Sequence, residues 1–240
     1  MTEIRPTVVV VIPCLNEEQF IGDIVIRSKQ YADKVIVVDD GSDDHTSDVA
    51  QAAGAEVVRH KTRQGAGAAT RTGFEVARKN KADIVVTLDG DAQHNPDEIP
   101  IVIAPIVEGK ADMVIGSRFV QADGRESNED TSRVFNIPWY RKYGIDAITW
   151  LYNVVSNVKV TDSQSCFRAH SRRLLEAIDI TDEGFGFSVE MLIQTRKKGL
   201  TISEVPVTCI YHSQSSSLNP VSHMLSVIFS MIKLRIRHRA

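Results

Sequence analysis

The chain has 240 residues, of which 42% are hydrophobic and 25% charged, and its formal net charge is -3. This size and composition fit one large domain, or one domain with an appendage, and the slightly acidic balance argues against a nucleic-acid-binding protein. Three widely spaced cysteines, Cys14, Cys166 and Cys209, provide neither a disulfide framework nor a zinc-ligand pattern, and they favour a reducing compartment.

The first half of the chain alternates between short apolar runs and helical patterns, as expected for repeated β-α-β units. It predicts an α/β protein with a mostly parallel, doubly wound sheet and right-handed connections. Asn95, which precedes Pro96, is the expected N-cap of one helix. In chain order, the predicted strands span 7–12, 34–38, 56–59, 84–88 and 112–115, and the predicted helices span 17–31, 43–53, 65–78 and 96–108.

Two carboxylates on alternate positions, Asp89 and Asp91, follow the predicted strand 84–88. Open α/β sheets bind ligands at the carboxyl ends of their strands. Hard oxygen ligands at this spacing suit Mg²⁺ or Mn²⁺, held by one or two carboxylates and the phosphates of a substrate. Gly90 lets the backbone approach that substrate closely. A solvated polar turn is the alternative interpretation.

Three further polar clusters follow other predicted strands, so the same sheet edge should gather them. Asn16 and Glu17 follow the first strand, Asp39 and Asp40 the second, and Arg118 the fifth. A carboxylate at this edge can accept hydrogen bonds from a base N–H or from ribose hydroxyls, and an arginine can hold a phosphate in bidentate fashion. Helix caps, an acidic turn and a surface arginine are the alternatives.

These clusters form four ordered motifs: Ile-Pro-x-x-Asn-Glu, Val-Asp-Asp-Gly-Ser-x-Asp, Leu-Asp-Gly-Asp-x-Gln-His and Gly-Ser-Arg. From about Val8 to Tyr211 the chain resembles the inverting family 2 glycosyltransferases of the GT-A fold. Within that family, the segment Asp162-Ser-Gln-Ser-Cys-Phe-Arg-Ala169 is similar to the Asp-x-x-Ser-Gly-Phe-Arg-Ala motif of the polyprenol-phosphate branch, typified by dolichyl-phosphate mannose synthases.

The resemblance implies roles for individual residues. It places Pro13, Leu15 and Glu17 in the nucleotide pocket and Asp39 and Asp40 on the base and ribose. The nucleotide sugar would also contact Asp89, Gly90, Arg118 and His212, while the divalent metal, Mg²⁺ or Mn²⁺, would bind Asp89, Asp91 and Gln93. Asp91, Arg118 and Arg141 would be catalytic, with both arginines meeting phosphates. Asp162, Gln164 and Arg168 would lie on the acceptor side.

The chain also departs from the family pattern. Cys166 stands where glycine is usual, and Arg63 stands where asparagine often precedes the Gly-x-Gly of the third helix. After Tyr211, His212 and Ser217 replace two cations that the mannose branch usually carries. The motifs therefore do not distinguish between GDP-mannose, UDP-glucose and UDP-N-acetylglucosamine as the donor.

The implied reaction moves a hexose from a nucleotide sugar to dolichyl or polyprenyl phosphate. A phosphate monoester has a second pKa of about 6, so such an acceptor is already an anion at neutral pH. An acceptor hydroxyl on a saccharide or protein would instead need a general base, for which Asp162 and Glu190 are the candidates. A non-catalytic nucleotide-sugar-binding homologue is the alternative from another class.

A lipid-borne acceptor requires a membrane-facing surface, and two segments could provide it. The aromatic residues of 145–155 suit a membrane interface, although packing against the sheet is the rival interpretation. The segment 224–239 is apolar with a basic end, as in an in-plane anchor drawn to anionic lipid; docking on the domain itself or on a membrane subunit is the alternative.

The sequence favours a protein that lies on a membrane rather than one that spans it. No apolar run approaches the ~20 residues needed to cross a bilayer, and we expect no signal peptide. We therefore expect a glycosyltransferase domain over 1–212, a basic amphipathic tail over 213–240, and a peripheral, cytoplasmic-face location.

Overall fold

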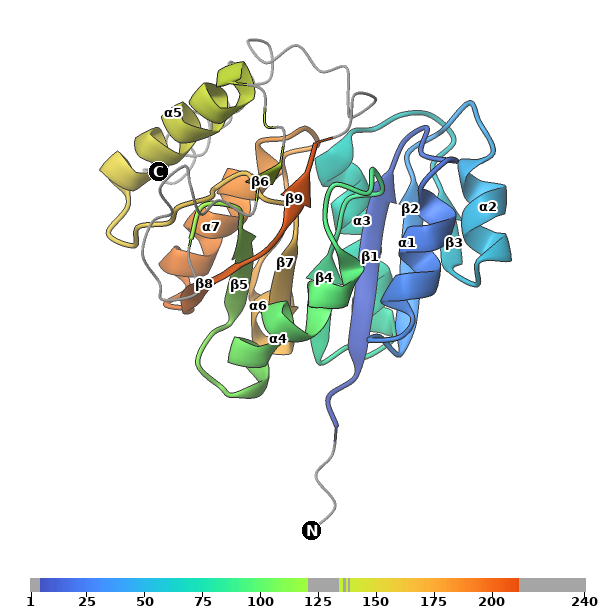
Figure 1. Ribbon diagram of the computed structural model, residues 1–240. Helices are drawn as coiled ribbons and strands as arrows, with labels where there is room; N and C mark the ends of the chain where they lie inside the picture. The colour runs from blue at the N-terminus through green and yellow to red at the C-terminus, as the bar shows by residue number, and fades with distance from the viewer. Residues whose placement is uncertain (1–4, 121–133, 136, 138, 212–240) are drawn as a thin grey trace.

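A computed structural model describes residues 5–120, 134–135, 137 and 139–211 (Figure 1). Its centre is a seven-stranded sheet in the order β3-β2-β1-β4-β7-β5-β8, in which only β7 runs antiparallel to its neighbours. Two further strands, β6 and β9, pair in parallel. The strands are β1 Val8–Cys14, β2 Lys34–Asp39, β3 Glu56–Arg59, β4 Ile84–Thr87, β5 Met113–Ser117, β6 Val134–Phe135, β7 Arg168–Ser171, β8 Ile202–Pro206 and β9 Cys209–Ile210. The predicted mostly parallel α/β sheet is confirmed.

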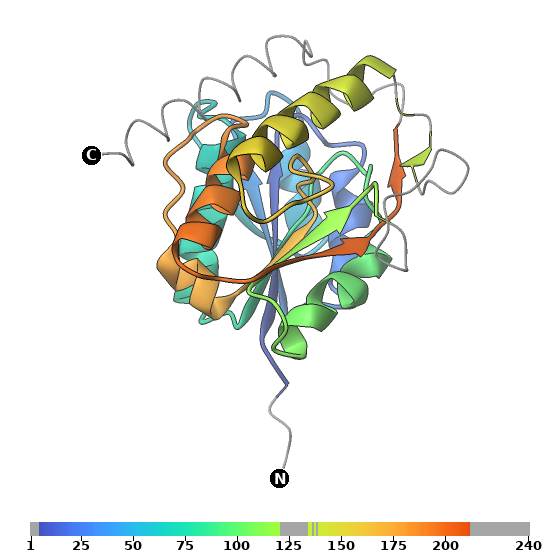
Figure 2. The same ribbon diagram turned by 90° about the vertical axis from the view of Figure 1, so that its left-hand side faces the viewer.

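Helices cover both faces of the sheet (Figures 1 and 2). The apolar residues of α1, α2 and α4 pack on one face, and those of α3, α6 and α7 pack on the other, together with part of α5. The helices are α1 Ile21–Ser28, α2 Thr46–Ala52, α3 Ala66–Lys79, α4 Ile99–Val107 after the 3₁₀ turn Pro96–Glu98, α5 Trp139–Val155, α6 Arg172–Ala177 and α7 Phe187–Lys197.

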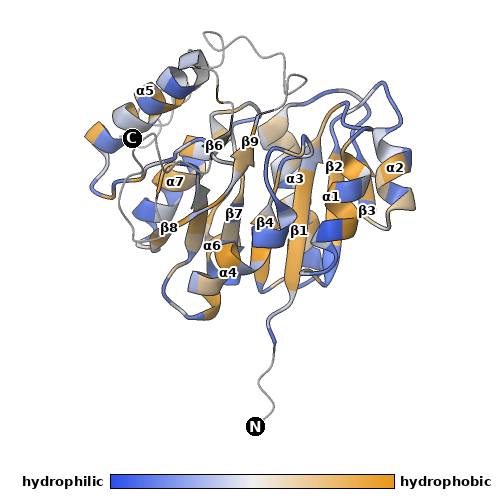
Figure 3. Cartoon of the chain, in the orientation of Figure 1, coloured by the Kyte–Doolittle hydropathy of each residue, from blue (hydrophilic) through white to orange (hydrophobic). Residues whose placement is uncertain are grey.

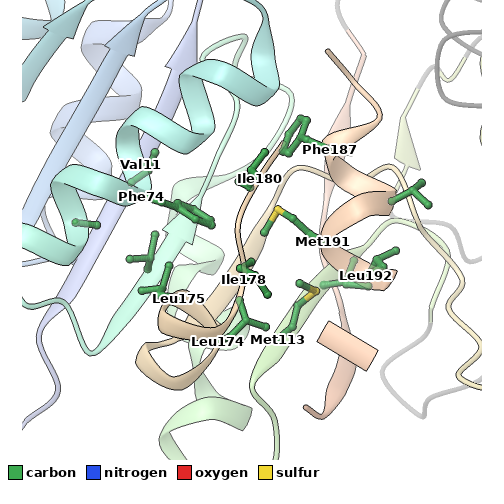
Figure 4. Packing of buried hydrophobic residues seen from close by; sticks show 14 of the residues in the cluster. Val11, Phe74, Met113, Leu174, Leu175, Ile178, Ile180, Phe187, Met191 and Leu192 are labelled. Carbon is green, nitrogen blue, oxygen red and sulfur yellow. The ribbon is translucent and has the colours of Figure 1, made fainter. Parts of the chain in front are cut away.

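The core follows from the two-residue alternation of the strands. In β1, Val9 and Val11 join the cluster under α3, while Val8, Val10 and Ile12 join the cluster under α1. This two-sided burial explains why β1 is hydrophobic along most of its length (Figure 3). Figure 4 shows the first cluster, in which Phe74 of α3 lies near Leu174 and Leu175 of α6, with Met113 of β5 and Met191 of α7 alongside. Each such buried side chain contributes about 1.5–3 kcal/mol.

Two helices begin later than their patterns predict. The helix expected over 17–31 starts at Ile21, because the backbone N–H groups of Asn16, Glu17 and Glu18 donate to side chains of the β2–α2 loop. The second helix, expected over 43–53, starts at Thr46, where the β2–α2 loop ends. The Asn95 N-cap is confirmed, since its side chain accepts a hydrogen bond from the N–H of Asp97 at 3.1 Å.

The sequence did not predict β7. It lies between β4 and β5, so these two strands are not neighbours, and it carries the buried side chains of Arg168 and His170. A strand of four residues with two buried ionisable groups has no apolar pattern to reveal it. Among the helices described, none is long and apolar enough to cross a membrane. The expected tail, 213–240, lies outside the described residues.

Candidate active site

A cavity of about 880 Å³ lies at the carboxyl edge of the sheet. Its walls come from the loops after β1, β2, β4 and β5, from one side of α5, and from the loop before α7. The residues predicted for the site that line the cavity are Pro13, Leu15, Glu17, Asp40, Asp89, Gly90, Asp91, Gln93, Arg118 and Gln164. The sheet therefore gathers most of the predicted polar clusters in one place.

The loops after β1 and β2 are joined by hydrogen bonds, which fixes one wall of the cavity. Asn16 adopts a left-handed conformation, with φ 58°. Its N–H donates to Ser42 Oγ at 2.9 Å and its side-chain oxygen accepts from the N–H of Asp43 at 2.9 Å. The N–H of Glu17 donates to Thr46 Oγ1 at 2.8 Å. These bonds hold the Glu17 side chain toward the loop after β4.

Three carboxylates gather where that wall meets the loop after β4. A Cβ on Gly90 would lie 3.0 Å from Cys14 Cβ and 3.4 Å from Glu17 Cγ, so a larger residue would crowd this close approach. Burial, followed by the negative charges of Asp91 and Asp89, raises the pKa of Glu17 to about 7. Burial and Asp91 likewise raise the pKa of Asp89 to about 7. The group is electrostatically suited to receive a cation.

The donor set fits a hard divalent ion that arrives with a diphosphate. Among the described residues, no group of three or more His, Cys, Asp or Glu side chains has the geometry to hold a metal ion. Mg²⁺ is commonly held by only one or two carboxylates together with substrate phosphates, and Asp89 and Asp91 can provide those two. Gln93, predicted as a metal ligand, lies beside Asp91: its side-chain amide and its backbone N–H both donate to the Asp91 carboxylate and so orient it.

The two acids after β2 differ in position. Asp40 lines the cavity, where its carboxylate accepts hydrogen bonds from the N–H of Gln64 at 2.9 Å and that of Gly65 at 2.7 Å. Asp39 is completely buried and does not line the cavity. Its carboxylate accepts from Ser42 and Ser47 and lies 3.6 Å from Arg59 Nε. Asp39 therefore supports the loop, and the expected contact with the nucleoside is left to Asp40.

Arg118 lines the cavity but is held from behind by a buried carboxylate. Its Nε and Nη2 donate to the two oxygens of Asp162 at 2.6 and 2.7 Å, and its Nη1 donates to Tyr211 Oη at 2.7 Å. Burial alone would raise the pKa of Asp162, but the charge and hydrogen bonds of Arg118 lower it. Three of the five guanidinium N–H groups are thus used within the protein.

The residues predicted for the acceptor side do not all reach the cavity. Asp162 is fully buried against Arg118, and Arg168 is buried with its guanidinium donating to the carbonyls of Ser163, Ser165 and Ser188 at 2.8 Å each. Neither lines the cavity, so a ligand in the cavity would not contact these two side chains directly. Glu190, the other candidate base, is buried away from the cavity, and its carboxylate accepts from Thr181, Asp182 and Gln194.

The structure does not describe the side chains of two predicted residues. Arg141 falls within α5, but its side chain is not described, and His212 follows the last described residue. Other residues that line the cavity were given no site role by the sequence: Asp44, Arg63, Gly144, Gly184, Phe185, Phe187, Ser188 and Tyr211. Ile145 and Ile148 also line it, and they belong to the segment 145–155 that was expected to face a membrane or to pack on the sheet. The Gly-Phe-Gly-Phe stretch at 184–187 is a signal that could have drawn attention to that loop.

Several known proteins are similar to this chain in sequence. A family model described as glycosyl transferase family 2 matches residues 9–177. A UDP-N-acetylglucosamine–dolichyl-phosphate N-acetylglucosaminyltransferase of Methanococcus voltae is 31% identical over 226 residues, covering 85% of this chain and 86% of the relative. An undecaprenyl-phosphate mannosyltransferase of Micrococcus luteus is 32% identical over 213 residues, covering 85% of this chain and 83% of the relative.

One solved structure resembles the chain over nearly its whole length. It is the glucosyl-3-phosphoglycerate synthase of Mycobacterium tuberculosis in complex with Mn²⁺, uridine diphosphate and glucosyl-3-phosphoglycerate. The TM-score is 0.73 at 26% identity, and the match covers 95% of this chain and 79% of that one. The region matched by the family model, residues 9–177, includes the loops after β1, β2, β4 and β5 that line the cavity.

Proposed function

The chain belongs to glycosyltransferase family 2, as its four motifs predicted, and from this premise we propose that it transfers a hexose from a nucleoside diphosphate sugar to a polyprenyl phosphate. The observation that carries the proposal is the single cavity that combines a carboxylate group for a cation, a buried acid for a nucleoside and an arginine for phosphate. The relatives named for dolichyl and undecaprenyl phosphate support the choice of acceptor.

On the donor side, Asp89 and Asp91 would hold the metal and Asp40 would hold the nucleoside. When bound, Mg²⁺ or Mn²⁺ neutralises the leaving nucleoside diphosphate as a Lewis acid. Gln93 keeps Asp91 oriented, and Arg118, locked by Asp162, offers its remaining N–H groups to a phosphate in the cavity. A preorganised arginine stabilises developing negative charge without rearranging during the reaction.

On the acceptor side, the position of the candidate bases favours a phosphate. A hydroxyl acceptor would need a general base beside the sugar. Asp162 and Glu190 do not line the cavity, and the carboxylates of Glu17, Asp89 and Asp91 lie in the group assigned to the cation. An acceptor phosphate needs no base, because it is ionised at neutral pH.

The outer side of α5 provides a surface for the lipid of such an acceptor. Trp139, Tyr143, Trp150 and Val154 follow helical spacing and are 73%, 69%, 66% and 59% exposed; we call them the α5 aromatic face. The inner side of the same helix contributes Ile145 and Ile148 to the cavity. Trp and Tyr favour membrane interfaces, so we propose that this helix places the cavity at a membrane surface. The tail over 213–240 would add to this attachment.

The test uses the full chain with UDP-glucose, UDP-N-acetylglucosamine and GDP-mannose, each offered with a polyprenyl phosphate or with the matching polyprenol. We expect product, identified by mass, only with the phosphate and only with Mg²⁺ or Mn²⁺ present. Transfer to the polyprenol, or to a saccharide but not to the phosphate, would refute the proposed acceptor. Turnover in EDTA-treated protein would refute the metal assignment.

A further inference from the structure

Most of the hydrogen-bonding capacity of Asp40 is already used inside the protein. Its Oδ1 accepts from His60 Nδ1 at 2.7 Å and from the N–H of Gln64 at 2.9 Å, and its Oδ2 accepts from the N–H of Gly65 at 2.7 Å. An ionised carboxylate offers about four acceptor positions on its two oxygens. About one position, on Oδ2, is left for a ligand in the cavity that Asp40 lines.

His60 prevents the Asp40 carboxylate from rotating to present more acceptor positions to the cavity. The imidazole is 8% exposed and follows β3 directly. Because a carboxylate only accepts, Nδ1 must carry the proton, and Nε2 then accepts from the Thr72 hydroxyl at 3.0 Å. The N–H of His60 also donates to the carbonyl of Asp39 at 2.8 Å. The ring is therefore fixed at both nitrogens and at its backbone, and it fixes Oδ1 in turn.

The nucleobases of common sugar donors present different edges to such a carboxylate. Uracil has a single N–H, at N3, flanked by two carbonyl oxygens. Guanine presents two adjacent donors, N1–H and the exocyclic amino group, and these need two acceptor positions side by side. The one open position of Asp40 satisfies uracil but can accept from only one of the two guanine donors, and a donor left unpaired in a pocket is costly.

We infer that Asp40, held by His60, makes the site selective for a uridine diphosphate sugar over a guanosine diphosphate sugar. The inference rests on the proposed function, because it takes Asp40 as the group that meets the base. His60 is a positioning residue in this scheme, since it acts through Asp40. The four motifs alone are compatible with either nucleotide, so the choice comes from the contacts of Asp40.

The first experiment measures the binding of UDP and GDP to the full chain by calorimetry in the presence of Mn²⁺. We expect UDP to bind at least about tenfold more tightly, which is the scale of one unpaired donor. Equal binding, or tighter binding of GDP, would overturn the selectivity while leaving the glycosyltransferase function intact. Failure of both nucleotides to bind would instead count against the proposed function.

A second experiment tests the role of His60 with matched variants. His60→Leu removes the donor to Asp40, so we expect weaker UDP binding and a UDP-to-GDP affinity ratio close to one. His60→Asn places an amide N–H near the former Nδ1 and should keep most of the ratio. His45→Leu, at an exposed histidine, serves as the control. An unchanged UDP-to-GDP affinity ratio in folded His60→Leu would refute the positioning role. If that variant does not fold, loss of the wild-type ratio in folded His60→Asn would refute it.

Discussion

The guanidinium of Arg118 and the carboxylate of Asp162 form a bidentate pair with distances of 2.6 and 2.7 Å, and both side chains are buried. The carboxylate is itself placed by Glu204, which accepts from the N–H groups of Thr161 and Asp162. The sequence suggested separate roles for the two partners, one on the donor and one on the acceptor. Their pairing makes them one unit, in which Asp162 orients the arginine that faces the cavity.

Asp162→Asn should destabilise the protein and impair turnover together. Removing one charge of a buried pair leaves the other uncompensated, which costs about 3–5 kcal/mol. We expect a loss of about 3 kcal/mol in the free energy of unfolding, measured by urea titration. Asp146→Asn, in the exposed pair with Lys142, is the control and should change stability by less than about 1 kcal/mol. Equal losses of unfolding free energy in the two variants would contradict the assignment of Asp162 and Arg118 as a buried, stabilising pair.

Asp91→Asn should abolish metal-dependent activity without unfolding the chain. The substitution keeps the shape of the side chain but removes one of the two carboxylates proposed to hold the cation. We expect a loss of turnover of at least about 100-fold, the low end of what removal of a key electrostatic group costs. The stabilisation of UDP-bound protein by Mn²⁺, read by thermal shift, should also disappear. Asp179→Asn, at an exposed acid, is the control and should retain both the turnover and the Mn²⁺ thermal shift. A Mn²⁺ thermal shift that survives in Asp91→Asn would rule out Asp91 as a metal ligand.

His170 should make folding sensitive to mild acid. Burial, together with the charge of Arg168, lowers the pKa of His170 to about 3. The unfolded chain takes up a proton near pH 6.5 but the folded chain does not, so stability is lost as the pH falls below 6.5. Relative to wild type, His170→Met should therefore gain about 2 kcal/mol between pH 7 and pH 5.

The comparison with wild type is needed because other groups titrate in the opposite sense. The pKa of Glu17 is raised to about 7, which stabilises the folded state as the pH falls through that value. This contribution is common to wild type and His170→Met and cancels in the difference. His45→Met, at an exposed ring, should show no such gain. A pH-independent difference for His170→Met would show that the buried ring titrates normally.

Two glycine-to-alanine substitutions should change stability in opposite directions. A Cβ on Gly67, in the first turn of α3, would overlap the carbonyl oxygen of Asp182 in the loop near the cavity. We expect a loss of about 1–3 kcal/mol from this overpacking. Gly144 lies within α5 with no atom within 4 Å of an added Cβ, so Gly144→Ala should gain about 0.5–1 kcal/mol. Thermal unfolding of the two variants tests the sign of each effect.

The α5 aromatic face should contribute to lipid binding but not to nucleotide binding. Replacing Trp150 and Tyr143 by Ser removes two exposed rings, so we expect weaker cosedimentation with vesicles that contain anionic lipid and an unchanged affinity for UDP. Ile26→Ser, which removes a 56% exposed apolar residue from α1, is the control. Undiminished vesicle binding would assign attachment elsewhere, and deletion of 224–240 would then show whether the tail provides it.

The sequence by itself determined five of the seven strands of the main sheet and the loops that carry the polar clusters. Hydrophobic runs such as 84–88 are local signals, and the rule that parallel strands present their carboxyl ends at one edge brings Glu17, Asp89 and Asp91 together. The family motifs named ten of the residues that line the cavity, because the spacing of the motifs is preserved in the chain itself. Each of these motifs depends only on its own strand and on the turn that follows that strand.

The tertiary structure decided which of these residues can meet a ligand. Asp39 and Asp40 are adjacent in sequence, yet one supports a loop and the other lines the cavity. Asp40 is limited by His60, 20 positions away, and Arg118 by Asp162, 44 positions away. Whether a polar side chain is free to bind depends on the donors and acceptors packed around it, and these come from distant strands such as β7. No local pattern encodes such partners, so they became visible only when the sheet had brought them together.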